Sequence, residues 1–488
     1  MDTSHLASLA AFRAATYSAF GRRQDALFEL CDTLLTTGPV PSLPLLSMQP
    51  QHQRRWGSLY DALAVGQISR PTLEHLLGSH PLAGGEPIYA VDVSVWPRSD
   101  AETSPERALY YHASRHSAGQ PIVAGWAYSW IAQLGFARES GTAPLRVRRL
   151  RPQENANVVA AEQIRAVLPD LPGVHADGAV PWVVFDAGYD PVQLTQSLGE
   201  TPAAIVGRLR AGRCFYADPS AQPKLGRRRR HGHKFICDES QTWPPPDGDL
   251  IVDDTQYGAV RVRAWTQLHP KTHGQHAQRD ARGWRPIVRG TLLLVEVSRL
   301  PQQTREPQAL WLWWHAPPDT PEAPLPDLDR VWRAYVRRFD LEHTFRFLQQ
   351  TLNWTLPRGR HPEQADRWTW LVVLAYTQLR LARPLAQDQP LPWQQAQPPG
   401  TLTPARVQRA SNGRLRSCCH GCRFWRARQT PVGARPGVPQ ASAPVVRRAI
   451  QPSRRPSSAP PKPRKSGDPP VRFRPATSLW DCRSPPHA

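Results

Sequence analysis

The stretch WRAYVRRFDLEHTFRFLQQ, residues 332–350, carries the most informative pattern in this chain. Tyr335, Arg338, Glu342 and Gln349 are separated by three, four and seven positions. On one helix with 3.6 residues per turn, these four side chains therefore share one stripe, and that stripe is distinct from the apolar packing face. A single carboxylate flanked by groups that bind phosphate predicts a site for a metal ion and a nucleic-acid backbone.

This spacing resembles the Tyr-x2-Arg-x3-Glu-x6-Lys motif of a large group of bacterial insertion-sequence transposases of the DDE type. Gln349 stands where that family has lysine. The segments YAVDVSVWPRSD (89–100), VVFDAGYDP (183–191) and FRFLQQTLNWTLPR (345–358) are similar to the family as well, so the resemblance runs from about residue 10 to about 410. It implies an α/β fold with a ribonuclease-H-like core, cleavage at insertion-sequence ends, and strand transfer by an enzyme with two Mg²⁺ ions, for which Mn²⁺ can substitute.

Three acidic residues are predicted to be both catalytic and metal-ligating: Asp92, Asp186 and Glu342. Asp92 lies in the β-branched run IYAVDVSVW, where a buried carboxylate is costly unless it binds a cation or ends at a cleft. Asp186 closes the run PWVVFDAGYD, and the carboxyl ends of strands are where open α/β sheets bind ligands. Each aspartate alone is better explained as a cap or a hydrogen-bonded acid, but all three in this order favour a site that cleaves phosphodiesters. Asp340 is rejected as the third ligand because it faces away from Glu342.

The predicted DNA contacts surround these acids. Tyr335 and Arg338 are expected to hold the phosphate near the scissile bond, and Arg346 is expected to assist one turn further along. Gln349 keeps hydrogen bonding but lacks the charge of lysine, which predicts weaker phosphate binding.

A run of four arginines in KLGRRRRHGHKF offers a second contact with DNA phosphates. These are Arg227, Arg228, Arg229 and Arg230. The alternative is a solvated charge run, because basic loops occur on many protein surfaces.

The order of apolar runs predicts strands at 88–96, 108–113, 121–128, 181–186 and 203–208, with a helix near 155–168. The 156 positions between Asp186 and Glu342 are too many for one helical crossover, so they must contain an insertion. Five segments follow from this pattern: an N-terminal helical region that binds DNA ends or caps the catalytic domain (1–85), the first part of the catalytic domain (86–208), a β-rich insertion (209–308), the second part of the catalytic domain (309–403) and a disordered basic tail (404–488).

The tail carries most of the positive charge of the chain. Residues 404–488 hold 18 basic and two acidic residues, which gives +16 of the net +21. A frameshift near residue 410 and an authentic arm that grips DNA both account for this composition. Double-stranded DNA is the expected partner and a homodimer the expected synaptic assembly. The absence of a long apolar run predicts no membrane span and places the protein in the bacterial cytoplasm, at the nucleoid.

Overall fold

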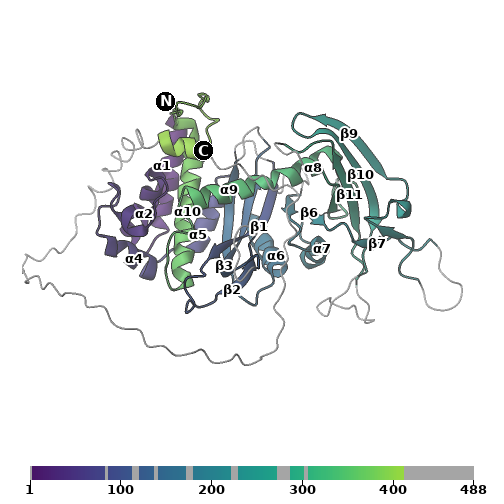
Figure 1. Ribbon diagram of the computed structural model, residues 1–488, viewed down its shortest axis with the longest axis horizontal. Helices are drawn as coiled ribbons and strands as arrows, with labels where there is room; N and C mark the ends of the chain where they lie inside the picture. The colour runs from purple at the N-terminus through teal and green to yellow at the C-terminus, as the bar shows by residue number, and fades with distance from the viewer. Residues whose placement is uncertain are drawn as a thin grey trace, which may run out of the picture.

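One ten-stranded mixed sheet runs through the protein, in the strand order β2-β3-β1-β5-β6-β12-β11-β10-β9, and β4 also pairs with β3 (Figure 1). The computed structural model describes residues 3–410 except 83–85, 113–119, 137–140, 172–179, 221–228, 272–285, 302–305 and 322. The strands are β1 Ile88–Pro97, β2 Ala108–Tyr111, β3 Ile122–Leu134, β4 Thr142–Leu150, β5 Trp182–Phe185, β6 Ala204–Leu209, β9 Gly248–Asp254, β10 Gly258–Leu268, β11 Gly290–Val297 and β12 Leu310–His315.

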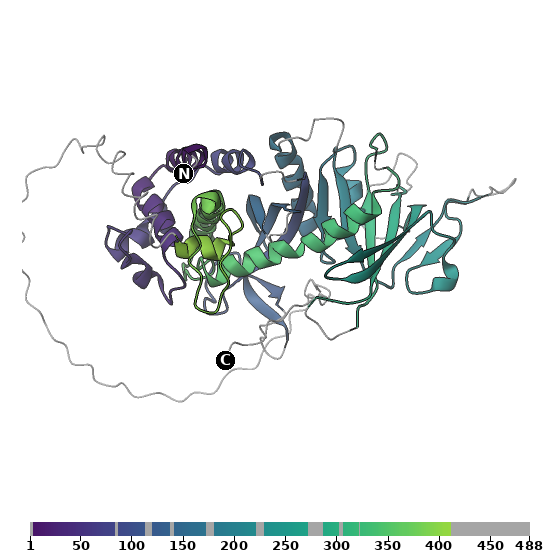
Figure 2. The same ribbon diagram turned by 90° about the horizontal axis from the view of Figure 1, so that it is seen from above.

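The helices cover both faces of this sheet. They are α1 Thr3–Ser18, α2 Gln24–Thr36, α3 Leu43–Ser47, α4 Trp56–Val65, α5 Arg70–Gly78, α6 Ala156–Val167, α7 Pro191–Leu198, α8 Leu328–Arg337, α9 Phe339–Gln350 and α10 Pro362–Ala382. One core packs α6 and α7 against one face of the sheet, while a second core packs α8, α9 and α10 against the other face. Figure 2 shows α8 and α9 lying end to end across the sheet. This arrangement confirms the α/β class and is consistent with a ribonuclease-H-like core.

The centre of the sheet is formed by β1, β5 and β6, which are parallel neighbours. Every residue of β5 and β6 is buried, as expected for strands covered by helices on both faces. Val91 of β1 pairs with Phe185 of β5, and Phe185 pairs with Gly207 of β6. This register places the carboxyl end of β5 beside the middle of β1 and near the carboxyl end of β6, where the candidate site lies.

The strand β4 was not predicted from the sequence, and β3 is longer than expected. This strand was missed because its arginines alternate with its apolar residues, a pattern that resembles a solvated segment. In the structure, Arg146 pairs with Glu74, and Arg149 forms an ion pair with Asp366 at 3.0 Å. These partners let a basic strand lie inside the fold.

Part of the predicted insertion continues the main sheet. β11 pairs with β12, β10 with β11 and β9 with β10, all antiparallel. A separate two-stranded sheet joins β7 Cys214–Tyr216 to β8 Lys234–Ile236. Trp265 is buried against Phe235 and Trp311, so it belongs to the core of this region. The division of the chain at 209 and 308 stays a prediction.

The N-terminal helices α1–α5 surround α10, as the view from above shows (Figure 2). Arg367 of α10 donates to the carbonyl oxygens of Leu63 at 2.7 Å and Gly66 at 2.6 Å. Arg380 of α10 donates to Pro81 O at 2.9 Å. These contacts attach the N-terminal helices to α10, and the assignment of residues 1–85 to DNA-end binding or to a cap stays a prediction.

The packed part of the chain extends past the predicted tail boundary at 404. Val407 is buried, and Gln408 Nε2 donates to Leu34 O at 2.9 Å and to Thr37 O at 3.0 Å. The rest of the predicted tail, 411–488, lies outside the described residues. Within the described part of the chain, no helix is long and apolar enough to cross a membrane.

Candidate active site

Asp92 projects from the middle of β1 toward the helix α9. It has the same strand parity as Ile88 and Ala90, which face the core containing α8 and α9. Its Oδ1 accepts a hydrogen bond from Val93 N at 2.7 Å. Burial raises the pKa of Asp92 to about 8, and the negative charges of Asp186 and Glu342 add to that rise, while Arg338 opposes it. The charges of both other predicted acids therefore raise the pKa of Asp92.

Asp186 follows directly after the last residue of β5. Its Oδ1 accepts a hydrogen bond from Gly188 N at 2.9 Å, which fixes the direction of the carboxylate. Asp190 has a different role in the same segment, because its Oδ1 caps α7 by accepting from Val192 N at 3.0 Å. Of the two aspartates in VVFDAGYDP, one faces the site and the other is structural.

Arg338 links Asp92 to Glu342. Its Nη1 lies 3.1 Å from Asp92 Oδ2, and its Nη2 lies 2.9 Å from Glu342 Oε1. The Arg338 side chain is 4% exposed, the Asp92 side chain 14% and the Glu342 side chain 39%. One guanidinium therefore holds an acid from β1 and an acid from α9 at the partly open edge of the buried core.

The predicted single helix is divided at Arg338, where α8 ends and α9 begins. Arg338 N donates to Tyr335 O at 3.2 Å. This hydrogen bond joins residues three positions apart, as in a 3₁₀ turn, and so tightens the backbone here. The direction of the predicted stripe also needs correction, because Tyr335 and Arg338 are buried against the sheet and only its far end is exposed. The stripe faces the sheet because Arg338 binds Asp92, which lies on strand β1, as well as Glu342 on α9.

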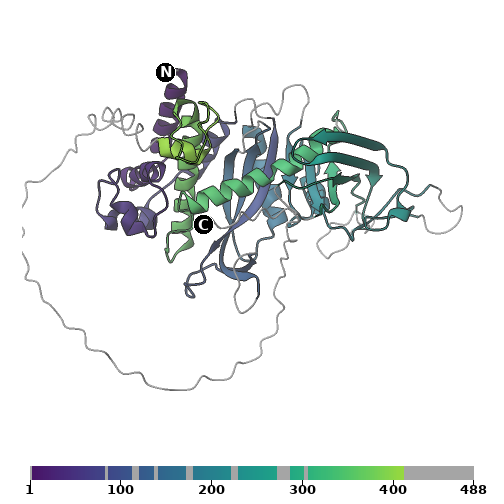
Figure 3. The same cartoon turned by 45° about the horizontal axis from the view of Figure 1, so that its top comes forward.

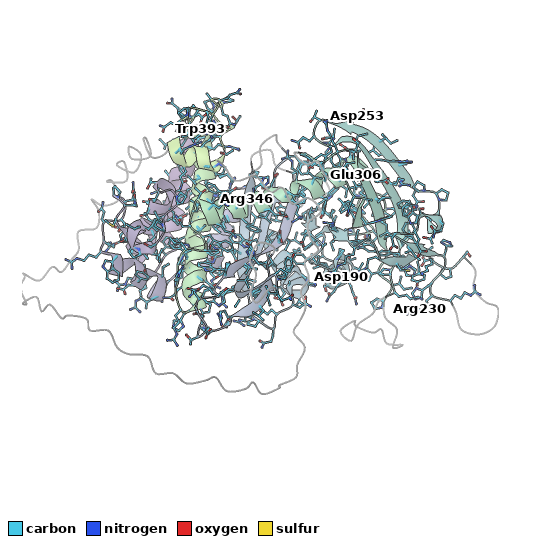
Figure 4. All side chains as sticks on the ribbon, viewed as in Figure 1. Asp190, Arg230, Asp253, Glu306, Arg346 and Trp393 are labelled. Carbon is cyan, nitrogen blue, oxygen red and sulfur yellow. The ribbon has the colours of Figure 1, made fainter. Side chains whose placement is uncertain are left out.

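The remaining predicted contacts that the structure describes are more exposed than Tyr335 and Arg338. Gln349 is exposed, and its Nε2 lies 3.5 Å from Ser94 Oγ of β1. Arg346 is exposed on α9 (Figure 4). Arg230 lies near β7, well away from Arg346 in the same view. Arg229 is exposed, whereas Arg227 and Arg228 lie outside the described residues.

The competing acids have structural partners. Asp340 is buried, and its Oδ2 lies 3.2 Å from Arg337 Nη1, on the side of the helix away from Asp92. Asp254 Oδ1 accepts hydrogen bonds from Gln256 N and Tyr257 N, as expected for a turn residue. The rejection of Asp340 as a metal ligand agrees with its contact with Arg337.

Comparison with known proteins identifies the family. A family model described as "DDE superfamily endonuclease" matches residues 16–271, more than half of the chain. The chain belongs to the DDE superfamily endonucleases. The match includes Asp92 and Asp186 and ends before Glu342.

Two further comparisons add little. Among solved structures, the piggyBac transposase synaptic complex with hairpin DNA matches with 11% identity and a TM-score of 0.36, over 83% of this chain and 73% of that chain. A likeness of that size carries no argument about this DDE endonuclease. No curated protein matches the chain.

The donor set of this DDE endonuclease fits the chemistry of a divalent cation. Carboxylate oxygens are the ligands that Mg²⁺ prefers. Burial, and after it the negative charges of Asp186 and Glu342, raise the pKa of Asp92, and a bound cation would oppose that rise. Within the described ranges, no three Asp, Glu, His or Cys side chains are close enough to ligate one ion together. In this arrangement Arg338 supplies the positive charge between Asp92 and Glu342.

One residue at the site was missed by the reasoning from sequence. Arg208 lies on β6, one position beyond Gly207, and is 9% exposed. The signal was present in the segment AIVGRLR, where a charged residue interrupts an otherwise buried strand. Without the strand order, nothing in that segment placed Arg208 beside Asp186.

Proposed function

We propose that this DDE endonuclease is a transposase that cleaves DNA at the ends of an insertion sequence and joins the freed strand to a target. The observation that carries the proposal is that two of the three predicted acids bind one guanidinium, while the third follows the strand that pairs with β1. Asp92 from β1 and Glu342 from α9 bind the same guanidinium, and the charge of Asp186 reaches Asp92. Acids converging at the carboxyl edge of a parallel sheet suit phosphodiester chemistry.

Asp92, Asp186 and Glu342 would hold two Mg²⁺ ions, or Mn²⁺ in their place. When bound, these ions would supply activation of the attacking water or 3′-hydroxyl and charge stabilisation of the leaving oxygen. The fixed Asp186 carboxylate and the buried Asp92 carboxylate would keep their oxygens directed into the site. Glu342, the most exposed of the three, leaves the site open on the α9 side.

The substrate would be double-stranded DNA, bound by a homodimer that brings two ends together. Contacts with DNA phosphates are assigned to Tyr335, Arg338, Arg346 and Gln349, and to the arginines 227–230. Exposed Arg346 is well placed to reach DNA that approaches α9 from solvent.

The test is a nicking assay on DNA that carries the sequences flanking this gene. Purified full-length protein with Mg²⁺ should nick that DNA at the element boundary. Asp186→Asn and Glu342→Gln should each reduce the rate by at least about a hundredfold, because each removes a charged metal ligand. Asp253→Asn is the matched control, since Asp253 is an exposed aspartate on β9 (Figure 4). Nicking that survives either active-site substitution, or that persists in a chelator, would contradict the proposal.

A second candidate is a copy that binds DNA but has lost most of its activity. Gln349 favours it, because this residue replaces the charged lysine of the resembling family. In that case the flanking DNA would bind to the protein but would not be nicked with either Mg²⁺ or Mn²⁺.

A further inference from the structure

A row of three charged side chains crosses the central strands at the level where β5 ends. The register aligns the position after Val91 with the position after Phe185, and that position with the one after Gly207. These positions are Asp92, Asp186 and Arg208. Neighbouring strands lie about 4.8 Å apart, so Arg208 is the immediate neighbour of Asp186 in this row.

Arg208 faces the same side of the sheet as the acids. The residues of β6 with its parity, Ala204 and Val206, belong to the core formed with α8 and α9, whereas Ile205 and Leu209 belong to the opposite core. Burial raises the pKa of Tyr335, and the positive charges of Arg338 and Arg208 oppose that rise. The guanidinium of Arg208 therefore lies near Tyr335 of α8, on the face that carries the candidate site.

The charge of Arg208 has no acidic partner in the described part of the chain. It is nine-tenths buried, yet no carboxylate there forms an ion pair with it. Burying a guanidinium that forms no direct ion pair is costly, so such a residue suits a ligand that supplies negative charge. A phosphate suits this role, because its oxygens match the planar fork of arginine.

Arg338 is in the opposite situation. Two of its nitrogen atoms already bind Asp92 and Glu342, at 3.1 and 2.9 Å. A guanidinium that is engaged by two carboxylates has fewer N–H groups left for a DNA phosphate than one without such pairs. The two buried arginines of the site thus differ in what they can still bind.

We propose that Arg208 binds a phosphate of DNA beside Asp186, in addition to the contact assigned to Arg338, which also holds Asp92 and Glu342 together. This inference rests on the proposed function and adds a substrate-binding residue to it. It places the DNA backbone over the ends of β5 and β6, between the acid row and α8. Arg208 would then hold the substrate phosphate next to the carboxylates that act on it.

The experiment measures binding of a fluorescent duplex from the gene-flanking DNA by anisotropy, without divalent ions, over a range of salt concentrations. Arg208→Met keeps the aliphatic stem but removes the charge. It should weaken binding roughly tenfold, because a hydrogen bond to a charged group is lost, and it should reduce the slope of log K against log salt by about 0.9. Arg208→Lys should restore most of the slope. Arg261→Met is the matched control, because Arg261 is a surface arginine of β10 that pairs with Asp249 at 2.6 Å.

The salt slope separates phosphate binding from a purely structural role, which would lower the melting temperature without changing the slope of the folded protein. If the methionine variant fails to fold, Arg208→Gln provides the same comparison with a polar side chain. Wild-type binding together with an unchanged slope in the uncharged variant would overturn this inference alone. Failure of the wild-type protein to bind the duplex at all would overturn the proposed function as well.

Discussion

At the scale of single residues, the site depends on the two ion pairs that Arg338 forms with Asp92 and Glu342. This arginine is almost fully buried, and its ion pair with Asp92 joins α9 to a strand that is distant in sequence, while its pair with Glu342 lies within the first turn of α9. Its removal would leave the carboxylates of Asp92 and Glu342 close together without a counter-ion. Breaking a buried pair in this way costs about 3–5 kcal/mol.

We therefore expect Arg338→Met to lower the free energy of unfolding by about that amount. Excess Mg²⁺ should recover part of the loss, because an ion that binds only the folded state stabilises it. Chemical denaturation of wild type and variant, each with and without Mg²⁺, measures both effects. Equal stabilisation of the two proteins by Mg²⁺ would show that Arg338 and the ion do not compete for the same carboxylates.

Gln349 offers a test in which function is gained. Gln349→Lys adds a positive charge at an exposed position next to β1, where the resembling family has lysine. Binding of the flanking duplex should strengthen, and the salt slope should steepen by about 0.9. Gln350→Lys controls for added charge in general, because Gln350 is exposed at the same helix end. Identical salt slopes for the two variants would remove Gln349 from the DNA contacts.

At the scale of elements, the end of the sheet near β7 and β10 holds a pair of stacked imidazoles. His231 Nδ1 lies 3.0 Å from His269 Nε2, and the backbones of Tyr216 and His269 form a bridge between the two strands. Burial lowers the pKa of His269, His231 and Arg289 lower it further, and Asp218 opposes them. The folded state therefore prefers neutral His269.

The sign of the pH dependence follows from this shift. The unfolded state binds the proton more readily, so the stability contributed by neutral His269 is present above about pH 6.5 and is lost as the pH falls below it. We expect the difference in melting temperature between wild type and His269→Gln to shrink between pH 7.5 and pH 5.5. Using the difference cancels the contributions of the carboxylates. A difference that stays constant across this range would mean that His269 is not held neutral by the fold.

Sequence reasoning was most successful for elements with strong apolar runs. It placed β1, β5 and β6 and the order of the three acids, because a buried parallel strand has a nearly continuous apolar sequence. It missed β4, where arginines satisfied by distant acids resemble surface residues. It also missed Arg208, because strand order and register depend on contacts between segments that are far apart in sequence.

At the scale of the whole molecule, one buried aspartate ties the N-terminal helices and α10 to the sheet. Asp366 of α10 accepts from Tyr128 of β3 and Arg149 of β4, both at 3.0 Å, and from Arg70 of α5 at 3.1 Å. It is 7% exposed. The N-terminal helices and the main sheet therefore share one polar network.

Asp366→Ala should lower the free energy of unfolding by about 3–5 kcal/mol, because it leaves Arg149 and Tyr128 buried without this partner. Glu363→Ala is the control: Glu363 is 54% exposed at 3.9 Å from Arg149, and its loss should change stability by less than about 0.5 kcal/mol. Denaturant titration followed by circular dichroism compares the two. Figure 3 shows how closely α10 and the N-terminal helices are associated, so both should unfold in the same transition. A separate early transition in the variant would show that the N-terminal helices are held by other contacts.

The central claim is that Asp92, Asp186 and Glu342 together bind the ions that act on DNA. Anomalous difference density from crystals grown with Mn²⁺ tests it most directly. The account predicts manganese peaks coordinated by carboxylate oxygens of these three residues, with the peaks lost in crystals of Asp186→Asn. Manganese bound elsewhere, with these three carboxylates unligated in a protein that nicks its flanking DNA, would contradict it.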